Sequence, residues 1–522
     1  MTAVEPPLPG LLAAPPPRPR WYHLQLLWLR HPRSRRVYDW LAPLLVTALA
    51  AVVRLSDLAH PHTLVFDETY YVKDAWTLLH LGYEGSWPEG ANEKFLAGDV
   101  NVFTDAPSFV VHPPLGRWII ALGLMALGPE SGWGWRLATA LVGVAAVFLL
   151  FVVGKRLSGS TTVGAIAAFL FAIDGLGIVM SRVALLDNAL MLFVLLAFLF
   201  VLLDRHRTRR RVLDTVAARA HGEPSVAWGP VLWNRPWVIA AGAAAGAACA
   251  VKWSGLYVLA ATGIYLVVSD ALWRRRAGVD FWPTDAAFRQ GPVTFLLLVP
   301  VAAVVYVASW TGWLVTDGGY SRNADPNPFV ALWKYHVAIY DFHVGLTSQH
   351  AYENPAWAWP LLTRPTWMYW NLTPQGQDSC TSPGGCAESI SSVPNPIIWF
   401  AGVAAVLWLI YRFVRTRDGR YGFVLTGVAA TYVPWLLYPE RTIFQFYTVV
   451  MLPFVLLALA LTLREIAGPP DASPERAQTG RWVVLVFLGV ATLVSAFFYP
   501  VWVGWEVPYE FWRLHNWVPS WV

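Results

Sequence analysis

Charged residues are scarce in this chain. Asp, Glu, Lys and Arg make up 14% of its 522 residues, whereas hydrophobic residues make up 56%. A soluble domain carries about 25% charged residues, so this chain has too few charges to cover its own surface in water. The shortage excludes an ordinary soluble protein and indicates an all-α polytopic membrane protein.

Other familiar signals are also missing. Residues 1–20 are rich in proline and have no apolar core, so we see no signal peptide and expect a cytoplasmic tail over 1–39. No Walker loop or useful GxGxxG pattern appears, which argues against a nucleotide-driven transporter. No His, Cys or Asp cluster has metal-ligand spacing, and we expect neither a metal nor a cofactor. The basic residues lie in short loops, which is typical of membrane topology and not of nucleic-acid binding.

Cysteine is rare, with three in the whole chain. Cys249 lies in an Ala/Gly-rich apolar run and is expected to be inert packing. Cys380 and Cys386 flank Thr-Ser-Pro-Gly-Gly in a polar loop. That spacing allows a disulfide, which requires an oxidising outer compartment, although spacing alone does not establish the geometry.

What the chain has in abundance is long apolar runs. About eleven can span a membrane, at 40–56, 135–154, 161–178, 184–203, 237–252, 253–271, 293–310, 395–412, 421–438, 443–463 and 481–500. Basic clusters separate them, at Arg30–Arg36, Lys155–Arg156, Arg205–Arg211, Arg274–Arg276, Arg412–Arg420 and Arg464–Arg481. Eleven spans place every cluster in the cytoplasm, as the positive-inside rule requires. We therefore expect a multi-pass protein of the cell membrane.

The same topology places two long polar stretches outside, and these should be structured loops. We divide the chain into the tail 1–39, a transmembrane catalytic module 40–310 with an external acidic loop 57–134, an external loop 311–394 and a C-terminal transmembrane module 395–522. The run 115–127 is too short to span and is expected to be a juxtamembrane or re-entrant helix. Lys252-Trp253-Ser254-Gly255 is expected to form an external turn.

Polar residues far apart in the sequence meet at this external face. Asp67 and Glu68 follow the first span, and a carboxylate there can accept a proton from a hydroxyl nucleophile. Cations at the membrane surface can hold the phosphate of a lipid carrier. We take Asp67 and Glu68 as catalytic candidates. The candidates for binding the donor phosphate are Arg136, Arg182, Lys252 and Arg441, and further site candidates are His112 and Asp187.

Each of these residues also has a simpler interpretation. The acidic pair and Asp187 can cap helices, and Arg136 and Arg182 can anchor spans at the interface. Arg441 can pair with Glu440, Lys252 can be a turn cation, and His112 can be a loop residue. His336, His343 and His350 recur every seven residues and can contact substrate, pack on a surface or hold zinc.

The motifs that carry these residues resemble the protein O-mannosyltransferases, which are C-type membrane glycosyltransferases. The resemblance covers nearly the whole chain and lies in Phe66–Tyr71, His112–Gly116, Trp135–Leu137, Arg182–Asn188, Lys252–Leu256 and Ser309–Trp313. It implies that mannose moves, with inversion, from polyprenyl-phosphate mannose to Ser or Thr of exported proteins. It further implies that Asp67 is the base, that Glu68 is a second required acid and that Arg136 is needed for activity.

One departure from the family narrows the expectation. Fungal and animal members carry an inserted β-trefoil domain in the large external loop, and the loop 311–394 is far too short for one. The chain therefore resembles the bacterial, especially actinobacterial, branch, which implies a bacterial polyprenol carrier. The expected partners are this lipid donor, exported protein acceptors, membrane lipids and the export machinery.

Two other functions remain open at this point. An enzyme of the same fold that acts on a lipid or polysaccharide would share the external acid and the carrier phosphate. A transporter or flippase would place charges near the membrane midplane and would often show inverted repeats. Here the charges lie at one surface, and no clear internal repeat is visible.

Overall fold

The computed structural model describes residues 31–522 except 221–222, 224, 379 and 469–471. Most of the expected tail 1–39 lies outside the described residues. The first helix of the described residues, α2 (Pro32–Leu55), begins before the apolar run at 40, because His31 caps its N-terminus and Pro32 occupies a first-turn position. Proline suits that position, since its missing N–H would have no helical partner there.

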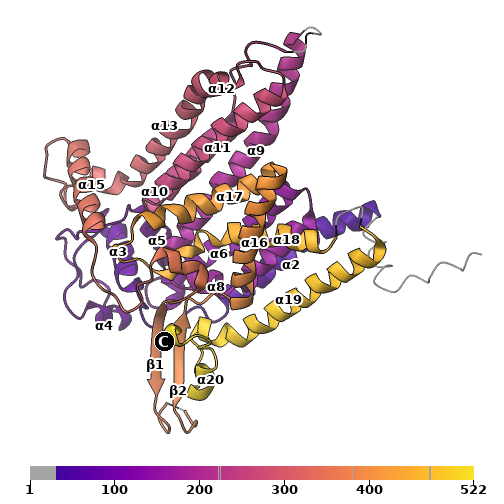
Figure 1. Cartoon of the computed structure of the whole chain (residues 1–522). Helices are drawn as coiled ribbons and strands as arrows, with labels where there is room; N and C mark the ends of the chain where they lie inside the picture. Colours follow the sequence, from indigo (N-terminus) through magenta and orange to yellow (C-terminus); the bar gives the residue numbers. More distant parts are fainter. Residues whose placement is uncertain (1–30, 221–222, 224, 379, 469–471) are drawn as a thin grey trace, which may run out of the picture.

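Long apolar helices form the body of the molecule (Figure 1). Seven in the described part of the chain are long and apolar enough to cross a membrane, and an eighth is possible if a bent pair counts as one span. The seven comprise α2, α6 (Gly132–Ser158), α9 (Asp187–Ala220), α11 (Gly255–Arg276), the stretch Trp282–Ser309 that includes α13 (Gly291–Ser309), α16 (Pro396–Thr416) and α19 (Pro474–Val503). The expected count of eleven stays a prediction.

The bent pair is α7 (Thr161–Ile173) and α8 (Gly175–Arg182), which meet at 61°. Asp174 stands at the break, and its carboxylate accepts from the N–H of Gly177 at the start of α8. Arg54 of α2 donates to the carbonyls of Phe171 and Ala172, which the break deprives of helical partners. The sequence suggested one continuous run here. The bend directs α8 toward the acidic loop.

One further apolar run has its expected length, and two others are less regular than expected. α10 (Pro236–Val251) is a helix of 16 residues, as long as the run 237–252. The run 421–438 divides into α17 (Gly419–Tyr432) and the 3-10 turn η3 (Val433–Leu437), where Pro434 removes a helical N–H. The run 443–463 begins as the 3-10 turn η4 (Gln445–Val449) and becomes α18 (Leu452–Ile466) only later. These irregular turns line the cavity described below.

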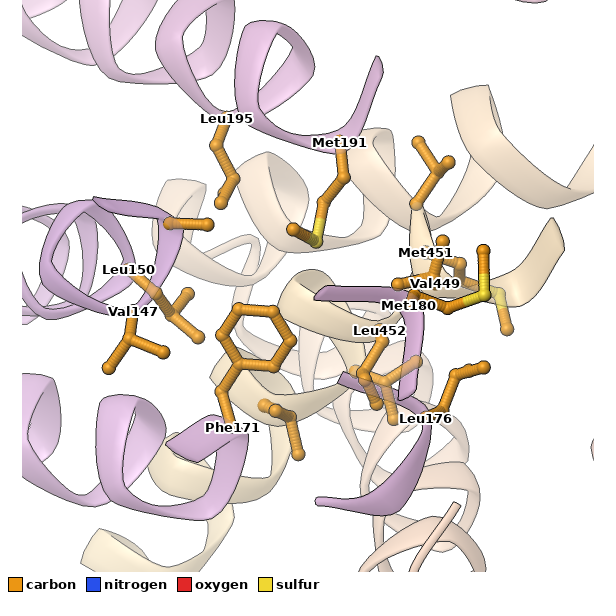
Figure 2. Packing of buried hydrophobic residues seen from close by; sticks show 14 of the residues in the cluster. Val147, Leu150, Phe171, Leu176, Met180, Met191, Leu195, Val449, Met451 and Leu452 are labelled. Carbon is orange, nitrogen blue, oxygen red and sulfur yellow. The ribbon is translucent and has the colours of Figure 1, made fainter. Parts of the chain in front are cut away.

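Side chains of α6, α7, α8, α9 and the η4–α18 segment interlock in the core (Figure 2). Phe171 packs beside Val147 and Leu150, while Met180 lies close to Met451 and Val449. All of these residues are buried. Dense packing of this kind fixes α8 against α9 and η4, and those three elements hold the residues of the acidic loop and the cavity.

Segments between the long helices make up the rest of the fold. Between α2 and α6 lie α3 (Glu68–Leu81), α4 (Ala91–Leu96) and α5 (Leu115–Leu127). Before α13 lie α12 (Trp282–Thr284) and the π-helical turn η1 (Asp285–Gln290), and after it α14 (Thr311–Val315), α15 (Pro328–Gly345) and η2 (Ala356–Leu361). The chain ends with α20 (Tyr509–Arg513) and η5 (Pro519–Trp521).

A small sheet adds to the expected helical architecture. β1 (Trp367–Thr373) pairs antiparallel with β2 (Cys386–Ser391), from Trp367 opposite Ser391 to Thr373 opposite Cys386. β2 also pairs with the short β3 (Val507–Pro508). Figure 1 shows the β1–β2 hairpin projecting from the helical body. A disulfide joins Cys380 to Cys386 at the hairpin's loop, while Cys249 is free and buried in α10.

Candidate active site

A cavity of about 510 Å³ lies where α9 and α11 begin. Its wall combines the turn before α11, the C-terminal half of α15, and the η3–η4 region. Four of the residues expected from the sequence line it, namely His112, Asp187, Lys252 and Arg441. The tertiary structure therefore brings residues from five separate segments around one cavity.

Asp67 lies immediately before α3 and beside this cavity, although it is not one of the lining residues. It follows Phe66, whose φ of 49° is a left-handed conformation uncommon for a residue with a side chain. In the described part of the chain its carboxylate takes part in no hydrogen bond or ion pair. Burial raises the pKa of Asp67 to about 6, with Lys252 lowering it and Asp187 raising it in smaller measure.

Glu68, the neighbouring acid, is fully buried and fully engaged. Its two oxygens accept from Nε and Nη2 of Arg136, each at 2.9 Å. They also accept from the backbone N–H groups of Val65 and Ala184, at 3.0 and 2.8 Å. Because every side of this carboxylate is occupied, it fixes the acidic loop to α6 and to the end of α8 and has no free edge for a substrate.

Two of the three arginines expected to bind phosphate, Arg136 and Arg182, are also occupied. Besides Glu68, Arg136 donates to the carbonyls of Leu58, Pro61 and Thr63. Its donors are satisfied within the loop that leads to Asp67, and it does not line the cavity. Phosphate binding by Arg136 stays a prediction, and all its hydrogen bonds here are to the protein's own acceptors.

Arg182 is occupied in the same way. It donates to the carbonyls of Arg54 and Ser56 at 3.1 and 2.6 Å and to that of Asp57 at 2.9 Å. These carbonyls stand at the end of α2, where the last turn of a helix leaves acceptors unpaired. Arg182 therefore secures the end of α2, and such a cap cannot be distinguished from an anion ligand by sequence alone.

Lys252 and Asp187 meet in the cavity wall. The Lys252 ammonium lies 2.7 Å from the Asp187 carboxylate and 4.9 Å from the centre of the Tyr447 ring. Burial disfavours its charge, but Asp187, Tyr447 and Asp67 together outweigh burial and raise the pKa of Lys252. The site therefore holds a charged lysine, Lys252, near Asp67, whose carboxylate has no partner in the described chain.

Arg441 supplies a second cation. Its Nη2 donates to Nδ1 of His343 at 3.1 Å, and its Nε donates to the His343 carbonyl at 3.3 Å. Its Nη1 is buried and has no hydrogen-bond partner among the described residues. A buried guanidinium N–H without a partner is costly, and a bound anion would satisfy it.

Two histidines complete this side of the cavity. His112 stacks on His343 with ring centroids 5.3 Å apart, and Nδ1 of His112 is buried without a partner in the described chain. Burial lowers the pKa of His343 to about 4, with Arg441 lowering it further, and it also holds the pKa of His112 well below its usual value. Both imidazoles are therefore neutral at pH 7.

Sequence reasoning missed Tyr447 and the residue that positions His112. Arg117 donates to the His112 carbonyl at 2.6 Å through a partly buried contact and to Glu84 at 2.8 Å through a buried one. Asp74 lies 4.0 Å from the same guanidinium, and burial raises its pKa to about 7. The position of Arg117 five residues after His112 was the available signal. Of the three spaced histidines, His336 binds Tyr306 at 2.6 Å and His350 lies beyond the end of α15.

Two apolar cavities continue from the first. The second, of about 600 Å³, shares Trp253, Leu256 and Tyr340 with it. The third, of about 530 Å³, shares Leu256 with both, and its lining follows α11 and α13 down to Gly291. We call these two cavities the apolar groove. A charged chamber thus opens into a long, nearly uncharged path beside two membrane-length helices.

The architecture defines the class of protein. The fold matches the S. cerevisiae protein O-mannosyltransferase Pmt1-Pmt2 complex bound to the sugar donor, with a TM-score of 0.69 over 96% of this chain and 94% of that one, at 15% identity. This is the C-type membrane glycosyltransferase fold, as expected from the sequence.

Sequence comparison then places the chain within the class. Residues 44–315 match the family described as dolichyl-phosphate-mannose-protein mannosyltransferase, and 328–521 match the C-terminal four-transmembrane region of protein-O-mannosyltransferase. The polyprenol-phosphate-mannose–protein mannosyltransferase of Mycolicibacterium smegmatis is 34% identical over 93% of both chains. Its counterpart in Corynebacterium glutamicum is 28% identical over 98% of this chain and 96% of the relative. The chain belongs to this mannosyltransferase family and is a glycosyltransferase.

Proposed function

We propose that this protein transfers mannose from a polyprenyl-phosphate mannose to Ser or Thr hydroxyls of exported proteins, with Asp67 as the general base. The observation that carries the proposal is a free carboxylate beside a chamber that contains Lys252 and Arg441 and opens into an apolar groove. A lipid-linked sugar phosphate needs an anion site joined to an apolar path, and the hydroxyl acceptor needs a base.

The donor phosphate is assigned to Lys252 and Arg441. Lys252 is charged through its contact with Asp187, and Arg441 has a buried N–H without a partner. Charge-assisted hydrogen bonds from such donors are roughly twice as strong as neutral ones. The prenyl chain would lie in the apolar groove between α11 and α13, so that the carrier remains in the bilayer while its sugar reacts at the membrane boundary.

The reaction proceeds by inversion in a single displacement. The Asp67 carboxylate takes the proton of the acceptor hydroxyl as the oxygen forms a bond to the anomeric carbon of mannose. The bond between that carbon and the phosphate oxygen breaks, and its electron pair leaves on the polyprenyl phosphate. A carboxylate whose pKa is raised to about 6 remains ionised at pH 7 and is a stronger base than an ordinary aspartate.

Glu68, Arg136 and Arg182 act on this reaction as positioning residues. Glu68 joins the acidic loop to Arg136 and to the N–H of Ala184, and Arg182 secures the carbonyls that precede the loop. A misplacement of about 1 Å can cost 100-fold in rate. This network explains why an acid that touches no substrate can still be required.

We assign the site to the external face of the cell membrane. The basic clusters at Arg205–Arg211 and Arg274–Arg276 lie at the opposite ends of α9 and α11 from the cavity, and the positive-inside rule places them in the cytoplasm. The disulfide between Cys380 and Cys386 suits an oxidising outer compartment. The acceptor would arrive there during export, beneath the 311–394 loop, which we retain as an external unit between the modules 40–310 and 395–522.

The test uses purified protein in lipid nanodiscs with labelled polyprenyl-phosphate mannose and a Thr/Pro-rich peptide. Wild-type protein should label the peptide without any ion gradient, which a transporter would not do. Asp67→Asn should reduce turnover by about 10²–10⁴-fold while donor binding is retained. Asp317→Asn, at an exposed carboxylate 3.7 Å from Arg322, is the matched control and should be fully active.

Two outcomes would contradict the proposal. Near-normal turnover in Asp67→Asn would remove Asp67 as the base. Labelling of added glycolipid in place of the peptide would move the enzyme to the branch of this fold that modifies lipids or polysaccharides.

A further inference from the structure

A second charged region lies at the far end of the helices that form the catalytic cavity. α11 begins beside the cavity at Gly255 and ends at Arg276. With a rise of 1.5 Å per residue, its 22 residues separate its two ends by about 33 Å. Figure 1 shows α12 next to the ends of α9, α11 and α13, remote from α3 and the sheet. This region therefore takes no part in the proposed transfer reaction.

Buried ion pairs make this end rigid. Arg235 contacts Asp204 of α9 at 2.6 Å and Asp270 of α11 at 2.7 Å, while Arg274 contacts Asp285 of η1 at 2.5 Å. These side chains are almost completely buried. Buried pairs that join three elements fix their relative positions, and the surface around them is therefore preorganised.

Exposed arginines stand on aromatic rings around this buried network. Arg209 and Arg276 lie over the same ring, Trp273, at 4.7 and 4.8 Å from its centre. Arg275 lies 5.5 Å above Trp282. These three arginines contact no acidic side chain in the described chain, so their guanidinium N–H groups are held in place yet available to an external anion. We call this surface the arginine platform.

A fourth arginine, Arg289, extends the platform over Trp228 at 5.2 Å, although it also pairs with Asp285 at 2.8 Å. Asp280 and Asp214 are exposed in the same part of the chain and oppose some of the positive charge. The platform nevertheless keeps a surplus of cations, since the nearby carboxylates of Asp204, Asp270 and Asp285 are committed to buried pairs.

Large apolar side chains next to the platform are exposed. Phe288 is 77% exposed and Phe281 51% exposed, and Trp233 is 58% exposed. Large aromatic groups so exposed at the ends of membrane-length helices are typical of the interfacial belt. Basic residues combined with aromatics in a segment that lies along a membrane surface are the signature of an anionic bilayer contact.

We propose that the arginine platform binds the headgroups of anionic phospholipids, with Phe281 and Phe288 inserted at the boundary of the acyl chains. The chemistry recognised is a lipid phosphate with net negative charge, which Arg209, Arg275 and Arg276 contact through their free N–H groups. Continuity with α11 and α13 favours a lipid over a soluble anion. This inference goes beyond the transfer of mannose and does not depend on it.

The test measures lipid retention and not activity. The protein is reconstituted with equal amounts of phosphatidylglycerol and phosphatidylcholine, extracted in mild detergent and analysed by native mass spectrometry. Wild-type protein should retain phosphatidylglycerol preferentially. Each arginine near an anionic surface contributes about fivefold, so Arg209→Gln with Arg275→Gln and Arg276→Gln should lower the preference by about tenfold or more.

A matched variant loses the same charge at arginines that do not stack on aromatic rings. Arg210→Gln, Arg219→Gln and Arg415→Gln alter three exposed arginines with no aromatic partner in the described chain, and the lipid preference should remain. Phe281→Ser with Phe288→Ser leaves every arginine in place and should weaken retention of phosphatidylglycerol. Unfolding temperatures measured in parallel identify any variant that fails to fold.

Three results would overturn the proposal. One is equal retention of both lipids by wild-type protein. Another is an equal loss of preference in the two arginine variants, because net charge alone would then explain it. The third is complete displacement of phosphatidylglycerol by millimolar inorganic phosphate, which would show a site for a soluble anion.

Discussion

The two ends of helices α9 and α11 both hold buried charges, yet they use them differently. At the far end the guanidinium groups of Arg235 and Arg274 form ion pairs with Asp204, Asp270 and Asp285. At the cavity end, Asp67 has no partner in the described chain and Arg441 keeps a buried N–H without one. The first arrangement is complete without a ligand, whereas the second is complete only with one.

The contrast also runs through the acidic pair itself. Glu68 accepts four hydrogen bonds, while Asp67, one residue away, accepts none at its side chain. Successive residues at a helix start point in different directions, so one acid enters the protein and the other faces the site. Charge and burial alone therefore do not mark a functional residue. What marks a functional residue is a hydrogen-bonding group that lies beside a cavity without a partner.

The largest effect on stability is expected at the saturated end. Arg235→Ala leaves Asp204 and Asp270 buried without their partner, which should lower the free energy of unfolding by about 3–5 kcal/mol. Mannose transfer per folded molecule should change little, because the site lies at the other end of α11. Thermal unfolding in nanodiscs checks this, with the exposed Arg210→Ala as the control. A stable but inactive Arg235→Ala variant would contradict the division between a structural far end and a functional cavity end.

The next effect concerns the cavity end. Arg441→Ala should leave stability nearly unchanged and raise the donor KM by about 10- to 100-fold, since a charge-assisted hydrogen bond to the phosphate contributes about 1.5–3 kcal/mol. The acceptor KM should stay the same. Steady-state kinetics with each substrate varied in turn makes the measurement. An unchanged donor KM would mean that Arg441 serves only to hold His343.

The pH dependence sharpens the distinction between the acids. Protonation of Asp67, whose pKa is about 6, removes the base, so kcat/KM should fall about tenfold per pH unit below that value. Burial lowers the pKa of His343 to about 4 and holds the pKa of His112 well below its usual value, so neither imidazole accounts for a loss of activity that begins near pH 6. Asp74, with a pKa of about 7, is the competing group. An Asp74→Asn variant should therefore still lose activity as the pH falls through about 6. If that loss of activity disappeared in Asp74→Asn, the titrating group would be Asp74 and not Asp67.

The smallest effect is expected from the aromatic partner of Lys252. Tyr447→Leu removes the ring 4.9 Å from the ammonium, and a partly buried cation–π contact is worth about 0.5–2 kcal/mol. Donor KM should rise by a factor of a few, with little change in kcat. Tyr447→Phe, which keeps the ring, should restore donor binding. If both variants were equally impaired, the hydroxyl and not the ring would be the important group.

Much of the architecture could be predicted from sequence because it depends on local composition. Apolar runs gave the positions of the long helices, and the turn at Lys252–Gly255 falls between α10 and α11 as expected. The bend at Asp174 and the loss of regular helix around Pro434 and Gln445 could not be predicted. Those breaks depend on partners distant in sequence, such as Arg54 and Asn354, that satisfy the exposed backbone or side-chain groups.

The candidate site divides in the same way. The kinds of residue it needs, an acid near the first span and cations for a phosphate, can be found from the chain's motifs. These motifs sufficed to select Asp67, Lys252, Asp187, His112 and Arg441. The same reasoning also selected Arg136 and Arg182. Free and capping arginines look alike in sequence, because the carbonyls that occupy them belong to other segments.

The sequence by itself determined a helical membrane protein with an acidic loop and a set of cations, since hydropathy and charge are properties of residues. Only the tertiary structure decided which charged side chains are paired within the protein and which remain available to a ligand. Hydrogen-bond satisfaction depends on distance and direction between segments, and here Glu68 meets Arg136 from 68 positions away along the chain. That pairing leaves Asp67, beside Lys252, as the acid without a partner in the described chain.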